Sequence, residues 1–177
     1  YGVNAVGKSS YMKSIGISII MAQAGFFVSA RSFKYSPYKY LFTRISSNDN
    51  RFKGQSTFAV EMSELRAILK RTNKYSLVLG DELCSGTETT SGLSIVTAGV
   101  MRLCEKKSSF VFATHLHQLS EMEEIKECGI VKNYHMETSY NEEKKQLIYN
   151  RKLKEGSGSS IYGLEVAKAM GLDKVFI

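Results

Sequence analysis

Three segments of the chain carry apolar residues at the spacing of an amphipathic helix. Within each segment these positions recur every three or four residues, which places them on one face of a helix and leaves the other face polar. The pattern therefore predicts three helices with one buried side each. The positions are Met12, Ile15, Ile19 and Ala22 in the first helix, Met62, Leu65 and Ile68 in the second, and Leu93, Val96, Val100 and Leu103 in the third.

Short apolar runs lie between and after these helices. Leu77 to Leu79 and Phe110 to Ala113 are continuous runs, which are typical of strands buried on both faces of a parallel sheet. Ile130 to Met136 and Gln146 to Arg151 flank a polar stretch at residues 141–145. That arrangement predicts an antiparallel hairpin.

The remaining segments complete a single α/β domain. Arg31 to Lys39 and Ser46 to Gln55 are predicted to be loops, and Tyr162 to Met170 is predicted to be a short helix. Strands that alternate with helices predict an α/β fold with a mostly parallel central sheet flanked by helices. A length of 177 residues, 43% of them apolar, favours one domain over residues 1–177.

Composition narrows the environment more than the activity. The net charge of +7 and the pI near 9.3 favour a polyanionic partner such as nucleic acid, although the basic residues are scattered and a solvated basic surface is the simpler interpretation. The three cysteines form no C-x-x-C pair, which fits a reducing intracellular compartment better than a disulfide framework or a zinc site. The apolar run from Ile15 to Met21 is far shorter than the roughly 18 to 20 residues of a membrane span, so no membrane segment is predicted.

The first chemical motif opens the chain. Residues 2–9 match the phosphate-loop pattern G-x-x-x-x-G-K-[ST] and run directly into the first predicted helix. Glycines at both ends let successive backbone N–H groups point at phosphate oxygens, and the helix N-terminus adds a positive field. Lys8 would contact the β and γ phosphates of ATP, and the Ser9 hydroxyl would ligate Mg²⁺. An ordinary Gly-rich turn is the alternative. The predicted nucleotide-binding residues are Gly2, Asn4, Ala5, Val6, Gly7, Lys8, Ser9 and Ser10.

Two carboxylates form the second motif. The apolar strand at Leu77 to Leu79 leads through Gly80 to Asp81 and Glu82, which places both carboxylates at the C-terminal edge of a parallel sheet, where ligands bind in such folds. Asp81 would hold the metal, and Glu82 would orient and deprotonate the attacking water. Alone, the same sequence would be only a capped strand end.

A histidine at the same edge is the third motif. Phe110 to Ala113 is followed by Thr114 and His115. Beside the other two motifs, His115 is predicted to sense the γ phosphate or its water. Such a residue is otherwise a satisfied hydrogen-bonding histidine. The predicted catalytic residues are therefore Lys8, Glu82 and His115, and the predicted metal ligands are Ser9 and Asp81.

These motifs, together with several further strings, make nearly the whole chain resemble the MutS mismatch-repair family. The most discriminating string is Ser56-Thr57-Phe58 followed by Glu61-Met62, which is peculiar to this family among the transporter-like ATPases. The other strings, in the family's order and approximate spacing, are the phosphate loop with Asn4, Phe42-Thr43-Arg44, the strand before Asp81-Glu82, Gly86-Thr87, and Phe112-Ala113-Thr114-His115.

The resemblance implies a composite nucleotide site. The fold would be a phosphate-loop NTPase of the ABC-ATPase type whose first strand is truncated in this chain. Two such domains face each other in the family, so that Ser56 would act in trans on the γ phosphate held by the other subunit. His135 would pack on the adenine, and Asn4 would contact the γ phosphate. From the residues alone, Ser56 would be an exposed loop serine and His135 a strand histidine.

The resemblance also implies a function. The chain would be the ATP-hydrolysing motor of a MutS-like protein that acts as a homodimer or heterodimer, intracellular and associated with DNA. Mismatched double-stranded DNA would be contacted mostly through regions outside this chain. Residues 156–177 would begin a helix-turn-helix dimerisation element.

Some positions depart from the family's usual pattern. Cys84 to Glu88 lacks the arginine usually found before Gly-Thr and resembles the branch of giant viruses and octocoral mitochondria. Gly80 and Val6 replace a bulkier residue and a glycine, respectively.

Two other functions are compatible with the motifs. They are another ABC-type DNA-associated ATPase, or an ATP-gated dimerisation module in which hydrolysis is incidental.

Overall fold

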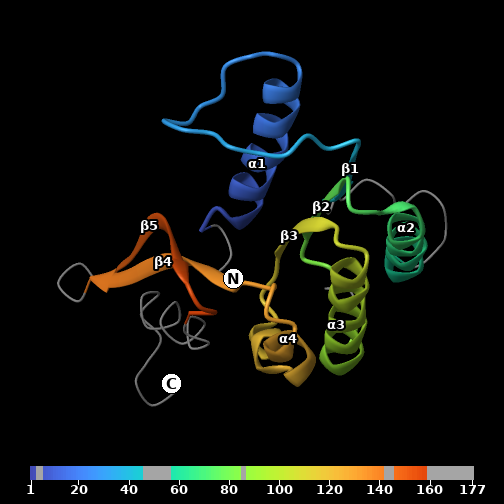
Figure 1. Cartoon of the computed structure of the whole chain (residues 1–177). Coiled ribbons are helices and arrows are strands. Elements are labelled where there is room, and N and C mark those ends of the chain that lie inside the picture. The colour runs from blue at the N-terminus through green and yellow to red at the C-terminus, as the bar shows by residue number, and fades with distance from the viewer. Residues whose placement is uncertain (3–5, 46–56, 85–86, 142–145, 159–177) are drawn as a thin grey trace.

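The computed structural model describes residues 1–2, 6–45, 57–84, 87–141 and 146–158. In this part of the chain a three-stranded parallel sheet is flanked by helices, and a two-stranded antiparallel sheet accompanies it (Figure 1). The predicted mixed α/β class with a parallel sheet is confirmed. The elements are α1 (Lys8–Gln23), β1 (Tyr40–Arg44), α2 (Thr57–Arg71), β2 (Ser76–Asp81), α3 (Thr89–Glu105), β3 (Ser109–Ala113), η2 (His117–Glu121), α4 (Glu123–Glu127), β4 (Tyr134–Asn141) and β5 (Gln146–Glu155).

The parallel sheet has the order β1-β2-β3, so that the strand carrying the two carboxylates lies in the middle. Arg44 pairs with Gly80, and Asp81 pairs with Ala113. The carboxyl ends of all three strands therefore meet at one edge, as the sequence predicts for β2 and β3. Every residue of β2 is buried, whereas most of β3 is half-buried, so burial on both faces holds for β2 but not for β3.

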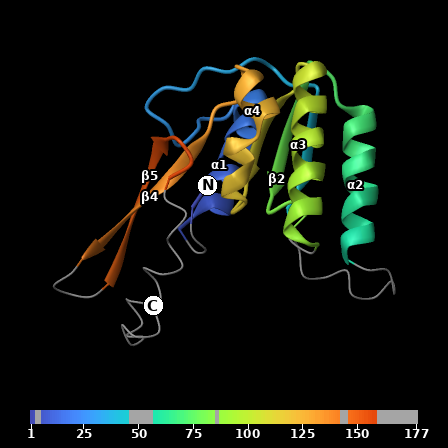
Figure 2. The same cartoon turned by 90° about the horizontal axis from the view of Figure 1, so that it is seen from below.

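Alternating side chains of β2 pack against helices on opposite faces of the sheet. Leu77 and Leu79 pack with Met12 of α1, and Val78 packs with Leu103 of α3 and with α2. Successive residues of a strand point to opposite faces, so this alternation builds one apolar layer on each side. Figure 2 shows α1 on one side of the sheet and α2 and α3 on the other.

A glycine lies just after the end of α1, where the chain turns. Gly25 has a φ of 82°, in the left-handed region that side chains with a Cβ rarely adopt. Its N–H donates to the Ala22 carbonyl at 3.1 Å, and the Phe26 N–H donates to the Met21 carbonyl at 2.9 Å. These two bonds satisfy the last carbonyls of the helix, as in a Schellman motif.

Several predicted boundaries need correction. The hairpin is antiparallel as predicted, but its first strand begins at Tyr134 instead of Ile130, because Gly129 turns with a φ of 63° and Ile130 is 68% exposed. Strand β5 continues beyond Arg151 to Glu155. Strand β1, η2 and α4 were not predicted. The predicted loop at residues 46–55 and the predicted helix at residues 162–170 lie outside the described residues.

A cavity of about 460 Å³ runs along the edge of β3 that faces away from β2. Ser109 to Thr114 line it on one side, and Tyr134 and Met136 line it on the other. The Tyr1 backbone N–H donates to the Tyr134 carbonyl at 2.6 Å, and the Met136 N–H donates to the Tyr1 carbonyl at 3.0 Å. Tyr1 is thus already paired with β4 where the chain enters the phosphate loop. Among the helices of the described residues, none is long and apolar enough to cross a membrane.

Candidate nucleotide site

Glycines stand at both ends of the phosphate loop because the backbone requires them. Gly7 has a φ of 106° and lies directly before α1. Gly2 has a φ of 146°, and a Cβ there would lie 3.0 Å from the Val6 side chain. Val6 is fully buried, so it cannot easily move to make room. Any other residue at Gly2 or Gly7 would strain the turn that precedes the helix.

Lys8 is the buried cation of this site. Its side chain is 7% exposed, and its Nζ donates to the Gly2 carbonyl at 2.6 Å and lies 3.9 Å from the Glu82 Oε1. Burial lowers the pKa of Lys8, and the neighbouring carboxylates of Glu82 and Asp81 act in the opposite direction. A buried ammonium group is costly unless an anion faces it. The arrangement suits a further anionic ligand at the mouth of the loop.

Asp81, the last residue of β2, and Glu82, the residue after it, have different surroundings. Asp81 is 8% exposed, and among the described residues its Oδ1 has no hydrogen-bond partner. Glu82 has a φ of 48°, its N–H donates to the Ala113 carbonyl at 2.8 Å, and its side chain is 34% exposed. A buried carboxylate oxygen without a donor is stabilised by a cation or a proton. Asp81 therefore has the chemistry of a metal ligand, and Glu82 that of a solvent-facing base.

Glu61 of α2 supports the loop behind these carboxylates, a role that the sequence analysis did not assign. The side chain is 6% exposed, and its Oε1 accepts a hydrogen bond from the buried Cys84 N–H at 2.7 Å. Cys84 itself has a φ of 61°. A signal was present in the sequence: Glu61 stands on the apolar stripe that continues with Leu65 and Ile68, and a carboxylate in such a place must be paired when it is buried.

The two histidines after β3 differ in their surroundings. His115 is exposed, and the described residues offer it no carboxylate partner. His117 is half-buried, and its ring stacks on Tyr1 with a centroid distance of 5.5 Å. Burial lowers the pKa of His117. His115 thus reaches the carboxyl edge of the sheet as predicted, while His117 packs against the residue that leads into the phosphate loop.

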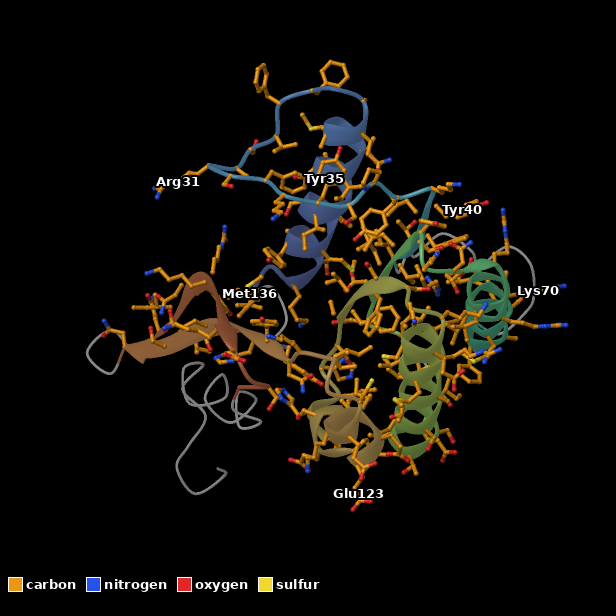
Figure 3. All side chains as sticks on the ribbon, in the orientation of Figure 1. Arg31, Tyr35, Tyr40, Lys70, Glu123 and Met136 are labelled. Carbon is orange, nitrogen blue, oxygen red and sulfur yellow. The ribbon has the colours of Figure 1, made fainter. Side chains whose placement is uncertain are left out.

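His135 lies on the strand that borders the phosphate loop. Its Nδ1 is 3.1 Å from the Gly156 carbonyl oxygen, and its backbone pairs with Lys154 of β5. The neighbouring Met136 is tied to Tyr1 by the backbone bond described above, and Figure 3 shows Met136 between β4 and the start of α1. His135 is therefore next to the strand residue that pairs with Tyr1.

The other predicted binding residues divide into two groups. Ser9 is the second residue of α1 and is half-buried, and Ser10 is exposed. Asn4, Ala5 and Ser56 lie outside the described residues. The structure therefore brings together Lys8, Asp81 and Glu82, with His115, His117 and His135 on the elements around them.

Comparison with known proteins identifies the family. The family model described as MutS domain V matches residues 1–177. The chain is 49% identical over 177 residues to a DNA mismatch repair protein MutS homolog of Acanthamoeba polyphaga mimivirus, covering 98% of this chain and 16% of that protein. It is 46% identical over 176 residues to a mitochondrial DNA mismatch repair protein MutS homolog of Sarcophyton glaucum, covering 99% and 17%. It is 43% identical over 174 residues to the DNA mismatch repair protein MutS of Clostridium tetani, covering 97% and 19%.

These relatives include a viral and a mitochondrial protein, the two sources that the loop from Cys84 to Glu88 indicates. The chain spans about a sixth to a fifth of the length of the relatives it matches. The match to the family model extends over the phosphate loop, the carboxylate pair and the hairpin alike. The chain belongs to the MutS domain V family, the nucleotide-binding ATPase domain of MutS-like DNA mismatch repair proteins.

Proposed function

We propose that this chain binds ATP at the phosphate loop and hydrolyses it with the groups gathered at the carboxyl edge of β2. The observation that carries the proposal is the buried Lys8 ammonium, 2.6 Å from the Gly2 carbonyl and 3.9 Å from the Glu82 carboxylate. The Lys8 ammonium would exchange the Gly2 carbonyl for oxygens of the β and γ phosphates. Backbone N–H groups of residues 2–9 would hold the remaining phosphate oxygens.

The residues present also fit Mg²⁺. The Oδ1 of Asp81, which has no hydrogen-bond partner within the described ranges, and the hydroxyl of Ser9 are hard oxygen ligands of the kind that Mg²⁺ prefers. One or two protein ligands are usual when phosphates supply the others. Asp81 would hold the ion directly or through water. Bound there, Mg²⁺ would neutralise charge that develops on the phosphate oxygens.

Glu82 is the general base in this proposal. Its carboxylate is partly exposed, so it can reach a water in front of the γ phosphate, while its N–H is fixed by the Ala113 carbonyl. Glu82 takes a proton from that water as the water oxygen attacks phosphorus, and the bond to the bridging oxygen of ADP breaks. His115, at the end of the adjacent strand, would contact the γ phosphate or the same water.

The domain would work in pairs, as an ABC-type ATPase. Ser56 would act in trans on the nucleotide of the other subunit, Asn4 would contact the γ phosphate, and His135 would pack on the adenine. Residues 156–177 would begin a helix-turn-helix dimerisation element within the single domain of residues 1–177. Because relatives at 43% to 49% identity are named as mismatch repair proteins, we propose that ATP turnover serves the handling of mismatched double-stranded DNA in a homodimer or heterodimer.

We also propose that a strand preceding residue 1 occupies the cavity beside β3. The cavity runs along the unpaired edge of β3, and Tyr1 lies at its end, hydrogen-bonded to β4. A strand in this place would join β3 to β4 and make the two sheets one. It would be the first strand of the ABC-type sheet. The relatives are about five to six times longer than this chain.

Nucleotide titration of the full-length protein tests the proposal. Lys8→Ala should abolish Mg·ATP binding, because it removes the buried ammonium group at the mouth of the loop. The matched control is Lys13→Ala, which removes an exposed lysine from the same helix and should bind ATP like the wild type. Wild-type protein that takes up no Mg·ATP, or Lys8→Ala protein that binds it normally, would refute the site.

A further inference from the structure

The edge of the sheet opposite the nucleotide site carries a cluster of cations that the ATPase chemistry does not use. The five members come from the start of β1, the end of α2, the loop before β2 and the loop after α3. All five are exposed. We call this cluster the basic edge, and it consists of Lys39, Lys70, Arg71, Lys74 and Lys107.

Hydrogen bonds hold the segments of the basic edge together. The Lys39 N–H donates to the Tyr75 carbonyl at 2.9 Å, which joins β1 to the loop before β2. Lys106 Nζ donates to the Leu69 and Thr72 carbonyls at 2.6 and 3.0 Å, which ties the end of α3 to the end of α2. The five cations therefore belong to one continuous surface. In Figure 2 the C-terminal ends of α2 and α3 lie together at this edge of the sheet.

Aromatic rings position three of these cations. The Nζ atoms of Lys39 and Lys74 both lie 5.1 Å from the centroid of the Tyr75 ring, and the Arg71 guanidinium lies 5.8 Å from the Phe42 centroid. Contacts of this kind limit the freedom of long side chains while leaving their charge accessible. Figure 3 shows Lys70 directed away from the sheet into solvent.

Within the described part of the chain, none of the five cations of the basic edge forms an ion pair with a carboxylate. The ion pairs of the described residues involve other cations. Glu105, two residues before Lys107, is paired with Arg102. Exposed cations without counter-charges repel one another, so the surface is poised for an anionic partner. The partner is not the nucleotide, because the strands separate the two edges by roughly 17 to 20 Å at about 3.3 Å per residue.

We propose that the basic edge binds the phosphate backbone of double-stranded DNA. Lysine and arginine on flexible stems suit a sequence-independent row of phosphates. Two lysines already cover the Tyr75 ring, so the ring fixes cations and is not free to stack on bases, as a platform for single strands would be. The ATPase domain thus contributes its own DNA contact, in addition to those that regions outside this chain would make. If the basic edge did not bind DNA, the proposed ATPase function would still stand.

Salt-dependent DNA binding by the full-length protein tests this proposal. The triple variant Lys70→Gln, Lys74→Gln, Lys107→Gln removes three charges and should be compared with the control triple Lys126→Gln, Lys132→Gln, Lys152→Gln, which removes three lysines elsewhere. With a mismatch-free duplex and about 50 to 200 mM salt, the slope of log K against log salt should become shallower by about 0.9 for each phosphate that the variant no longer neutralises. At about 0.1 M salt the Kd should rise about tenfold or more. DNA-independent ATP turnover should be unchanged, which shows that the variant is folded.

Three results would overturn the proposal. The first is a triple variant whose Kd for DNA and salt slope equal those of the wild type. If that variant also lost binding to a protein partner, the basic edge would serve an acidic protein surface instead of DNA. The second is an equal weakening of DNA binding in both triple variants, which would show only an effect of net charge. A photo-crosslinking residue in place of Lys107 gives a local readout, because it should crosslink to the duplex, and its failure to do so would also count against the proposal.

Discussion

The carboxylate of Glu61 accepts a hydrogen bond from the backbone N–H of Cys84 at 2.7 Å, and both residues are buried. This bond joins α2 to the turn that follows Asp81 and Glu82. In that turn Glu82 and Cys84 have φ values of 48° and 61°, which are uncommon for residues with side chains. Glu61 therefore holds the conformation in which Glu82 faces the phosphate loop.

Glu61→Ala should slow ATP hydrolysis without preventing ATP binding. The variant leaves the buried Cys84 N–H without an acceptor, which costs about 1–3 kcal/mol and frees the turn to shift Glu82. We expect kcat to fall at least tenfold while the Kd for Mg·ATP changes little, as measured by steady-state hydrolysis and nucleotide titration. Glu61→Gln keeps an acceptor oxygen and should recover most of the rate. Equal reductions of kcat in the two variants would contradict a role that depends on the hydrogen bond.

Glu82→Ala should stop turnover but preserve ATP binding. The Lys8 ammonium and the loop backbone remain, so the triphosphate is still held, while the group that takes the proton from water is gone. Single-turnover hydrolysis should fall by about 10² or more. Glu64→Ala is a suitable control, because it removes a glutamate of α2 that pairs with Arg44 instead. Normal steady-state hydrolysis by the Glu82 variant would mean that another group is the base.

The sequence was sufficient to predict the helices and strands whose buried residues follow a regular pattern. Helical spacing located α1, α2 and α3 because each buries one continuous stripe, and the uniformly buried β2 appears as a run of apolar residues. Parallel pairing then places Asp81 beside the phosphate loop, since the carboxyl ends of parallel strands share an edge.

Elements stabilised by distant contacts were not predictable from local pattern. Strand β1 has no fully buried residue among those described, and its short apolar run from Tyr40 to Phe42 leads directly into the polar Thr43 and Arg44. The five-residue helix α4 is held by Ile125, which packs into the cluster formed with α3. The pairing of Glu61 with Cys84 joins residues 23 positions apart, and no spacing rule connects them.

Gly80→Ala should destabilise the domain through two neighbours, chiefly Phe112 and also Leu83, whose Cδ1 would lie 3.2 Å from the added Cβ. A Cβ at this position would lie 2.7 Å from the Phe112 Cδ1, and the Phe112 ring is packed against the cluster of Ile68 and Leu103. Overpacking of this kind costs about 1–3 kcal/mol. In the full-length protein, the unfolding transition of this domain is the one whose melting temperature ATP raises. Gly80→Ala should lower the melting temperature of that transition.

A double-mutant cycle shows whether Phe112 is the cause. Phe112→Leu should relieve the overlap, so the two substitutions should couple by about 0.5–3 kcal/mol. Gly99→Ala is the matched control, because a Cβ there meets nothing within 4 Å and alanine favours a helix by about 0.5–1 kcal/mol. Additive effects of Gly80→Ala and Phe112→Leu would show that the glycine is required for another reason.

His117 should make the domain less stable in mild acid. Burial lowers its pKa in the folded state below the ordinary 6.5, so the unfolded chain binds a proton first as the pH falls. The free energy of unfolding therefore decreases as the pH drops through about 6.5 and continues to decrease until the folded-state pKa is reached. His117→Gln should flatten this part of the profile between about pH 7.5 and 5.5. An unchanged acid sensitivity in the variant would assign the effect to other groups.

The open edge of β3 should become protected when the chain is extended upstream. In the described residues, the β3 edge beside the cavity of about 460 Å³ has no strand partner, so its amide hydrogens are expected to exchange readily in a chain that begins at Tyr1. A strand placed there would pair with β3, and each apolar side chain buried in the cavity would add about 1.5–3 kcal/mol. Hydrogen exchange of Ser109 to Ala113, compared between this chain and one extended at its N-terminus, measures the difference. Equal exchange in the two chains would mean that something other than a preceding strand covers β3, and that the sheet does not continue to β4 through Tyr1.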